Sequence, residues 1–200
     1  MSMLGHVAIG VAAARLVTPA GKPSHVLRTR MVVLTALALL PDVDFLIEAV
    51  APSASPFAHR GASHSFAIAM VVGASIAVAI RLRGGRRAVT WGLLATAVVA
   101  SHGVLDWLGE SDLGVALLWP MSNARFLATW HLLPNPPWQG LLSAHGFSEL
   151  ALEFAVFLPF WLYAFLPRRL FVPRVQSCPP GRPYARPTPL RRRGDRRGPV

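Results

Sequence analysis

The chain has 200 residues, of which 53% are hydrophobic and only 14% are charged, and its formal net charge is +11. Its apolar residues form long runs without the periodicity of an amphipathic helix or strand, and a chain of this length cannot build a soluble core large enough to bury them. The composition therefore excludes an ordinary soluble domain and predicts a membrane protein.

Five apolar segments are expected to form the helices of an all-α, polytopic membrane bundle. In chain order they are Met3–Val17, Met31–Val50, Ser65–Leu82, Ala88–Leu108 and Phe147–Leu166. The last four have 18 to 21 residues, enough at about 1.5 Å per residue to cross roughly 30 Å of hydrocarbon. The first is shorter and is expected to be tilted, re-entrant or interfacial. A signal peptide is the alternative, although no Lys or Arg precedes its apolar stretch.

Lys and Arg residues concentrate in alternate connections between these segments. If the N-terminus lies outside, the inner parts are Arg15–Arg30, Arg81–Arg87 and everything after Leu166, which together hold 18 of the 20 basic residues. Only Arg60 and Arg125 then remain outside. Because basic residues favour the cytoplasmic side of a bilayer, this distribution predicts an inner-membrane protein with its N-terminus out and its C-terminus in.

Residues 167–200 differ from the membrane-embedded part, residues 1–166, and are expected to form a separate tail. They hold ten basic residues and are rich in Pro, Gly and Arg, a composition that predicts a disordered cytoplasmic segment. Such a tail is attracted to anionic lipid headgroups, so membrane lipids are expected partners and nucleic acid is disfavoured. The only cysteine, Cys178, lies here, which leaves no disulfide framework and no thiolate metal site.

Histidine and acidic side chains collect on the predicted outer side. Six of the seven histidines and eight of the nine acidic residues fall there, the exceptions being His25 and Asp195. A carboxylate or imidazole inside a membrane segment is costly unless it is paired, hydrated or bound to a metal. Each such residue is therefore a functional candidate.

Two carboxylates, Asp42 and Asp44, follow Pro41 inside the second segment. Proline lacks an N–H and distorts a helix, which frees backbone groups and widens the local geometry. Asp42 lies eight residues before Val50, and this places it about 12 Å below the outer end of the segment. The alternative is a Pro-Asp turn at the membrane surface with both carboxylates solvated.

His102 and Asp106 are four residues apart and share one helix face, so a ring nitrogen and a carboxylate oxygen can reach one cation. A direct His–Asp hydrogen bond that satisfies both groups is the alternative. His6 opens the first segment at the same level, where it is either a ligand or an ordinary histidine at a helix start.

The sequence HRGASHS, residues 59–65, joins the second and third segments on the outer side. His59 and His64 are candidate ligands, and Ser63 or Ser65 is expected to cap the third helix. Arg60 either clamps an anionic substrate or contacts lipid phosphate, and both interpretations stay open.

Seven candidate ligands thus come from four separate stretches and fall within about 12 Å of one membrane face by the helix-rise estimate. Mixed imidazole and carboxylate ligands suit Zn²⁺, Mn²⁺ or Fe²⁺, and seven donors exceed the four of one tetrahedral Zn²⁺ site. We therefore expect one or two divalent ions, with Zn²⁺ favoured. The predicted ligands are His6, Asp42, Asp44, His59, His64, His102 and Asp106.

These residues resemble the YdjM-like family of membrane-bound metal-dependent hydrolases. The resemblance covers roughly residues 1–165 and lies in the order of its elements: His6, Pro41–Asp44, His59–Ser65, His102–Asp106, and Leu118–Ser122 followed by Arg125. The loop after Asp106 departs from the pattern, because Glu110, Ser111 and Asp112 replace an expected Thr/Gly-rich turn. The resemblance implies a metal-dependent hydrolase and says little about its substrate.

The expected reaction is cleavage of a phosphoester or lipid-linked substrate by a metal-activated water at the outer face. Arg60, Asp106 and Glu149 are the candidate catalytic residues. Arg60 or Arg125 would hold an anionic substrate, and Glu149 or Glu153 would supply a base or a hydrogen-bond acceptor, unless both glutamates are surface carboxylates at a helix start. The alternative functions are a metal-binding or ion-transporting membrane protein without hydrolase activity, and a structural protein whose His and Asp groups only pair.

Overall fold

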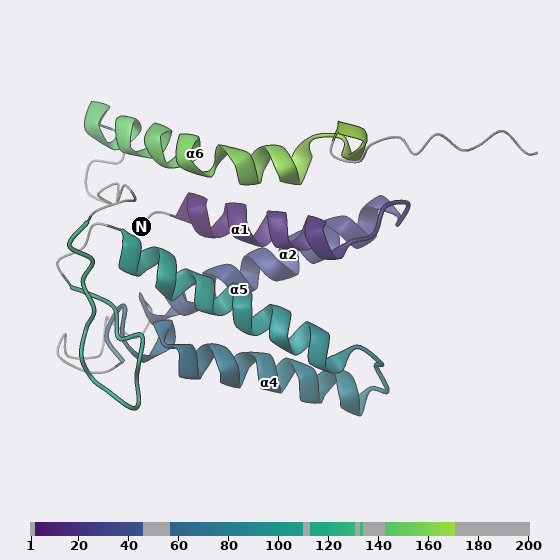
Figure 1. The fold of residues 1–200 in the computed structure, drawn as a ribbon, viewed down its shortest axis with the longest axis horizontal. Coiled ribbons are helices and arrows are strands. Elements are labelled where there is room, and N and C mark those ends of the chain that lie inside the picture. The colour runs from purple at the N-terminus through teal and green to yellow at the C-terminus, as the bar shows by residue number, and fades with distance from the viewer. Residues whose placement is uncertain (1–2, 46–56, 110–112, 131–132, 134–142, 171–200) are drawn as a thin grey trace, which may run out of the picture. The chain divides into compact units, whose positions relative to one another are not determined.

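A computed structural model describes residues 3–45, 57–109, 113–130, 133 and 143–170 of the chain (Figure 1). Over these residues the protein is all-α, as the hydrophobic runs predict, and apart from two isolated β-bridges it has helices and loops alone. The α-helices are α1 (Met3–Val17), α2 (Ser24–Leu39), α4 (Phe66–Leu82), α5 (Ala88–Leu108) and α6 (Ala144–Phe165). Three short 3-10 helices are η1 (Leu40–Asp44), η2 (Ala62–His64) and η3 (Arg168–Leu170).

The chain divides into two compact units, Met1–Leu166 and Pro167–Val200, and all five α-helices belong to the first. The tail predicted to be disordered lies, from residue 171 onward, outside the described residues.

Two helices, α5 and α6, are long and apolar enough to cross a membrane, and α1 and α4 are shorter apolar helices. Large hydrophobic side chains stay exposed along α6, among them Phe154, Leu158 and Phe165, as lipid contact requires. Four long segments were predicted, but α4 has 17 residues and the second segment is interrupted. Within the described part of the chain the length criterion is therefore met by two helices.

The second predicted segment, Met31–Val50, differs most from the structure. α2 begins at Ser24, and its α-helical part ends at Leu39. η1 follows with Pro41 near its start, because a proline inside an α-helix removes a hydrogen bond and clashes with the preceding turn. The last residues of the predicted segment, 46–50, lie outside the described residues.

Close helix packing depends on glycine at two places. A Cβ atom on Gly10 of α1 would lie 2.6 Å from the Cα atom of Thr35 in α2, and one on Gly73 of α4 would lie 2.5 Å from the carbonyl oxygen of Gly92 in α5. Small residues at such contacts are the usual way in which membrane helices approach each other. The core where α1, α2 and α5 meet is formed by Ala14, Leu34, Ala38 and Val98.

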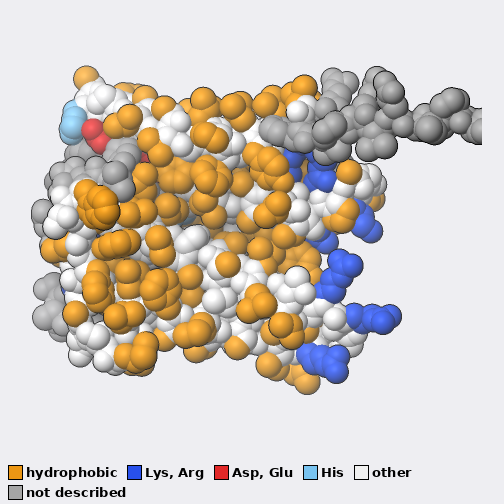
Figure 2. All heavy atoms as spheres, viewed as in Figure 1, with side chains coloured by type: hydrophobic (Ala, Val, Ile, Leu, Met, Phe, Trp, Pro, Cys, Tyr) orange, Lys and Arg blue, Asp and Glu red, His pale blue; other side chains and the backbone are white. Residues whose placement is uncertain are grey.

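The two ends of this bundle differ in charge. The end of α1, the start of α2 and the connection from α4 to α5 lie at one end (Figure 1). Lys and Arg side chains gather there on the face shown in Figure 2, while hydrophobic side chains cover the middle. The opposite end holds the start of α1, both η1 and η2, and the end of α5 (Figure 1).

Arg15, a buried cation near the end of α1, links α1 to α6. Its guanidinium group donates one hydrogen bond to the carbonyl of Ala164 at 2.8 Å and another to the carbonyl of Leu166. These carbonyls belong to the C-terminal end of α6, where free acceptors and the helix dipole favour a positive charge. The helix pair that carries His6 is therefore held at this end by a polar contact.

Candidate metal centre

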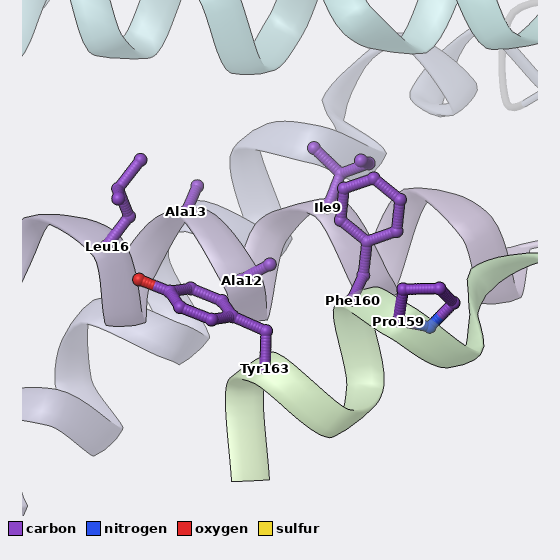
Figure 3. A pocket seen from close by; sticks show the side chains of 7 residues that line it. All are labelled: Ile9, Ala12, Ala13, Leu16, Pro159, Phe160 and Tyr163. Atoms are coloured by element: carbon purple, nitrogen blue, oxygen red, sulfur yellow. The ribbon is translucent and has the colours of Figure 1, made fainter. Parts of the chain in front are cut away.

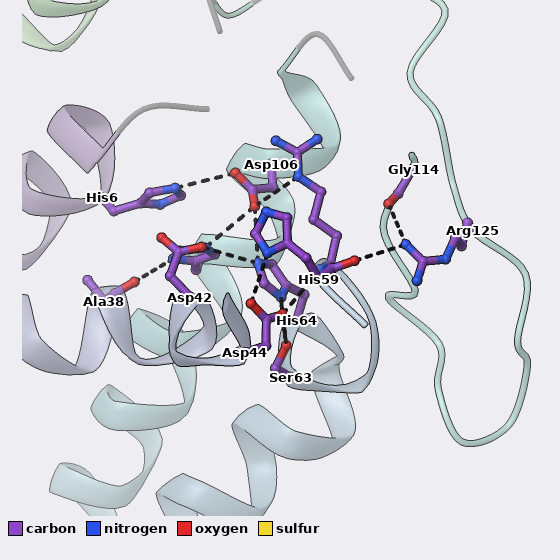
Figure 4. A network of polar contacts seen from close by, with 12 residues as sticks. His6, Ala38, Asp42, Asp44, His59, Ser63, His64, Asp106, Gly114 and Arg125 are labelled. Carbon is purple, nitrogen blue, oxygen red and sulfur yellow. Dashed lines mark hydrogen bonds and ion pairs between the residues drawn. The ribbon is translucent and has the colours of Figure 1, made fainter. Parts of the chain in front are cut away.

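Four side chains from three elements converge at the end of the bundle opposite the basic connections. Asp42 comes from η1, His64 from η2 and Asp106 from α5 (Figure 4). His102 also belongs to α5, one turn before Asp106. One donor atom from each lies within 4.8 Å of every other. His64 reaches α5 because Gly103 leaves room for it: a Cβ atom on Gly103 would lie 2.3 Å from the His64 carbonyl oxygen.

The distances between these donor atoms resemble the edges of a metal-coordination polyhedron. Nε2 of His64 lies 3.2 Å from Oδ2 of Asp106 and 3.7 Å from Oδ1 of Asp42. Nε2 of His102 lies 3.2 Å from the same Asp42 oxygen and 3.5 Å from the same Asp106 oxygen. Metal–ligand bonds of about 2.0–2.1 Å at tetrahedral angles place neighbouring ligand atoms roughly 3.3 Å apart, so these four contacts have the spacing of atoms that could share one metal ion.

The tautomer of His102 is fixed by the backbone of α2. Its Nδ1 atom lies 2.6 Å from the carbonyl oxygen of Ala38, and a carbonyl only accepts, so Nδ1 carries the proton. In the neutral ring Nε2 then presents a lone pair to the carboxylates of Asp42 and Asp106. Two lone pairs cannot face each other at this distance without a positive charge between them, which is either a proton or a cation.

His64 is held in the same tautomer. The hydroxyl of Ser63 donates to Oδ2 of Asp44 at 2.6 Å, so its oxygen accepts from Nδ1 of His64 at 2.8 Å. The Nε2 atom of His64 is buried and has no hydrogen-bond partner among the described residues. Burial lowers the pKa of His64, but the carboxylates of Asp106, Asp42 and Asp44 outweigh that effect and raise it to about 10.

Asp44 holds the loop that carries His64. Besides the Ser63 hydroxyl, it accepts a hydrogen bond from Nδ1 of His59 at 2.8 Å and one from the backbone N–H of Arg60 at 3.2 Å. His59 also stacks on Phe45, with ring centroids 3.8 Å apart. Asp44, His59 and His64 are close enough to form a second three-residue metal site, but both Asp44 oxygens already accept hydrogen bonds.

His6 lies beside the four converging groups. Its side chain is 1% exposed and stacks on His102 with centroids 3.6 Å apart and the rings 8° from parallel. Its Nε2 atom is 3.4 Å from Oδ1 of Asp106, yet neither ring nitrogen has a hydrogen-bond partner among the described residues. His6 thus faces the oxygen of Asp106 that His64 and His102 do not approach.

Arg60 has an unusual backbone conformation, and part of its guanidinium group makes no hydrogen bond among the described residues. Its φ angle is 60°, in a region that non-glycine residues seldom adopt, and such strain often accompanies functional sites. Its N–H is bound by Asp44 and its carbonyl by the N–H of Ala116. The guanidinium group is buried, its Nε lies 3.7 Å from Oδ2 of Asp106, and Nε and NH1 have no hydrogen-bond partner among the described residues.

The remaining predicted residues lie outside this cluster. Arg125 donates to the carbonyls of His59 at 3.1 Å and Gly114 at 3.5 Å, so it braces the loop. Glu149 is half-buried on α6, and among the described residues no hydrogen bond or ion pair joins it to the cluster. Glu153 is completely buried and accepts a hydrogen bond from the backbone N–H of Gly5.

The sequence did not predict two contacts of the cluster, the Ala38 carbonyl with His102 and the Ser63 hydroxyl with His64. The carbonyl of Ala38 that orients His102 is invisible in a sequence, because any residue there supplies one. Of the two serines considered as helix caps, Ser65 takes the role by accepting from the N–H of Ile68 at 3.2 Å. Ser63 instead hydrogen-bonds to both Asp44 and His64. Its place next to a candidate ligand in the sequence was the one sign that it could contact that ligand.

Comparison with known proteins adds a family to this geometry. Residues 1–172 match the family described as YdjM inner membrane protein. The chain is also 36% identical over 104 residues to the inner membrane protein YbcI of Escherichia coli strain K12, a match that covers 50% of this chain and 59% of that protein. No solved structure matches the chain. With a family match over most of its length and helices apolar enough to cross a membrane, this chain belongs to the YdjM family of inner membrane proteins.

Proposed function

We propose that this chain is a membrane-bound metal-dependent hydrolase. Asp42, His64, His102 and Asp106 would bind one divalent cation, for which Zn²⁺ is the favoured candidate. The observation that carries the proposal is the meeting of four electron-rich atoms, from three buried side chains and the partly buried Asp42, at the distances of neighbouring metal ligands. A cation bound there would act as a Lewis acid and lower the pKa of a coordinated water towards neutrality.

The residues around the four ligands have separate roles in this proposal. Asp44 orients His64 through Ser63, and a hydrogen-bonded partner of this kind fixes the tautomer of a ligating histidine. His59 donates its Nδ1–H to Asp44 and so helps to fix the carboxylate that orients the His64 loop. His6 lies against Asp106 and His102 and completes the wall of the site.

Arg60 is proposed to bind the anionic part of the substrate. Its guanidinium group lies next to Asp106, and two of its nitrogen atoms lack hydrogen-bond partners among the described residues. Arginine matches the geometry of phosphate and carboxylate groups, and a buried guanidinium group that is held in place stabilises negative charge that develops in a transition state. This favours a phosphoester over a neutral substrate.

The site is proposed to face the outer side of the membrane. His102 and Asp106 lie near the end of α5, whose first residue follows the basic pair Arg86 and Arg87. The 21 residues of α5 span roughly 30 Å, so the basic connection and the site lie at opposite ends of one spanning helix. Because basic connections favour the cytoplasm, the site would open outward.

A lipid-linked substrate is supported by an apolar cleft between α1 and α6 (Figure 3). The cleft has a volume of about 400 Å³ and is lined by Ile9, Ala12, Ala13, Leu16, Pro159, Phe160 and Tyr163. Ile9 is three residues from His6, which corresponds to about 4.5 Å along the helix. An acyl chain in this cleft would place its headgroup near the metal centre, so membrane lipids are the proposed substrates or partners.

Metal analysis of detergent-purified protein tests the ligand set. The wild type and the control His145→Ala, which changes an exposed histidine on α6, should each hold one ion per chain. His64→Ala and Asp106→Ala should lose it, and retained metal in both variants would contradict the proposed ligands. Turnover of bis(p-nitrophenyl) phosphate and of phospholipids then tests the reaction. A wild type that binds the ion but cleaves no member of the panel would support the metal-binding or ion-transporting alternative.

A further inference from the structure

A buried carboxylate on α6 lies outside the set of proposed ligands. Glu153 is 0% exposed, although it belongs to an apolar helix long enough to cross the membrane. A carboxylate in such a place is costly unless another group compensates its charge, so it is a functional candidate by default. Its Oε1 atom accepts a hydrogen bond of 2.9 Å from the backbone N–H of Gly5, 148 residues away in the sequence.

The start of α1 supplies the group that interacts favourably with this carboxylate. The first N–H groups of any α-helix lack partners within the helix, and they carry a partial positive charge that a carboxylate stabilises. α1 has no acidic residue in its first turn, and its start is buried at Gly5 and His6. Glu153 therefore caps the first turn of α1 from another helix.

Two other contacts, one apolar and one polar, already hold α6 against α1. Phe157, one turn after Glu153, is buried in a cluster with Ala8 and Leu133, and Arg15 fixes the other end of the helix pair. Neither contact needs a carboxylate at position 153. The feature that Glu153 adds is a fixed position for the first turn of α1.

The residue after Gly5 is His6, and its side chain has little else to hold it. Neither ring nitrogen of His6 has a hydrogen-bond partner among the described residues. Its contacts with the cluster are the stacking on His102 and the 3.4 Å approach to Asp106. The placement of this ring therefore depends on where the first turn of α1 begins.

We propose that Glu153 is a positioning residue of the metal centre, acting through the Gly5 N–H to hold His6 against Asp106 and His102. This inference rests on the proposed function where it concerns the metal, and it assigns α6, which supplies no proposed ligand, a part in the site.

The position of His6 can be tested first without any metal. In metal-free, detergent-purified protein, His6 should resist modification by diethylpyrocarbonate because it is buried. Glu153→Leu should make His6 reactive, Glu153→Gln should keep most of the protection because an amide oxygen still accepts the Gly5 N–H, and Phe157→Leu should keep it as well. Equal protection of His6 in the wild type and Glu153→Leu would overturn the proposal, and so would equal reactivity in Glu153→Leu and Phe157→Leu.

Metal affinity and a double-mutant cycle then test the route through His6. Glu153→Leu should weaken Co²⁺ binding roughly 10- to 100-fold, the usual effect of losing a group that orients a metal site, and should shift the visible spectrum of the bound Co²⁺. In a His6→Ala background the same substitution should change affinity less than about threefold, because coupled residues are not additive. An equal loss in both backgrounds would overturn the proposal. If the wild type binds no metal, the proposed function fails, while the modification experiment still decides whether Glu153 positions His6.

Discussion

Asp44→Asn should weaken zinc binding roughly 10- to 100-fold without abolishing it, as expected for a residue that orients a ligand. Asp44 accepts hydrogen bonds from His59, the Arg60 amide and the Ser63 hydroxyl. Asparagine replaces one carboxylate oxygen by an NH₂ donor, so at least one of these three donors loses its acceptor. A hydrogen bond to a charged group contributes about 1.5–3 kcal/mol, which corresponds to roughly 10- to 150-fold in an equilibrium constant.

The assay is competition for Zn²⁺ against a chromophoric chelator, together with the number of ions per chain. Asp42→Asn is the matched variant, because the Asp42 oxygen faces both His64 and His102, and it should lose the ion under the same conditions. If Asp44, His59 and His64 held a second ion, the wild type would carry two and Asp44→Asn would keep one with unchanged affinity. That stoichiometry, or an affinity of Asp44→Asn equal to that of the wild type, would refute the orienting role of Asp44.

Three further outcomes follow from the geometry. Arg60→Ala should keep the zinc content but lower kcat roughly 10²–10³-fold, with partial recovery in Arg60→Lys; undiminished turnover would contradict its role. Because the pKa of His64 is raised to about 10, its proton stabilises the metal-free fold fully below its unfolded value near 6.5, and this stabilisation is lost as the pH rises through about 10. The denaturant concentration at the midpoint of unfolding should therefore decrease as the pH is raised from 7 to 10 in metal-free protein. The decrease should be smaller in zinc-loaded protein. Ala13→Phe should raise KM for long-chain but not short-chain phosphoesters, whereas Ala74→Phe, in the cleft of about 380 Å³ between α4 and α5, should change neither.

Much of the helical framework could be predicted because long apolar runs need little else to become helices in a membrane protein. α1 and α5 have the predicted bounds, and α4 starts one residue late because Ser65 is its cap. α6 starts three residues before its predicted first residue, where Ser143 accepts from the N–H of Gly146. The start of α2 could not be predicted from hydropathy, since the segment from Ser24 to Arg30 is largely polar and basic and none of its residues is buried.

In the candidate site, the sequence predicts contacts within one helix but not those that depend on the fold. The spacing of His102 and Asp106 predicts a shared helix face, and both meet the same partners in the structure. The different contacts of Asp42 and Asp44 could not be predicted, because they depend on a 3-10 helix that contains Pro41 and takes the place of a continuing α-helix. The Glu153 contact with Gly5 joins residues too distant in the sequence for any local pattern to relate them.

The charges at the site give a reason why a cation is needed. Among the described residues, the cluster holds the carboxylates of Asp42, Asp44 and Asp106 and one guanidinium group, that of Arg60, which lies beside Asp106; with neutral imidazoles these groups sum to two negative charges. Surrounding helices and lipid cannot solvate two buried charges, and their isolation would be strongly destabilising. A divalent cation between His64, His102 and the carboxylates neutralises them in one step, whereas the metal-free protein must hold protons on its imidazoles instead. For this reason metal loading should raise the free energy of unfolding of the wild type, and should not do so once Asp42 and Asp106 are both replaced by asparagine.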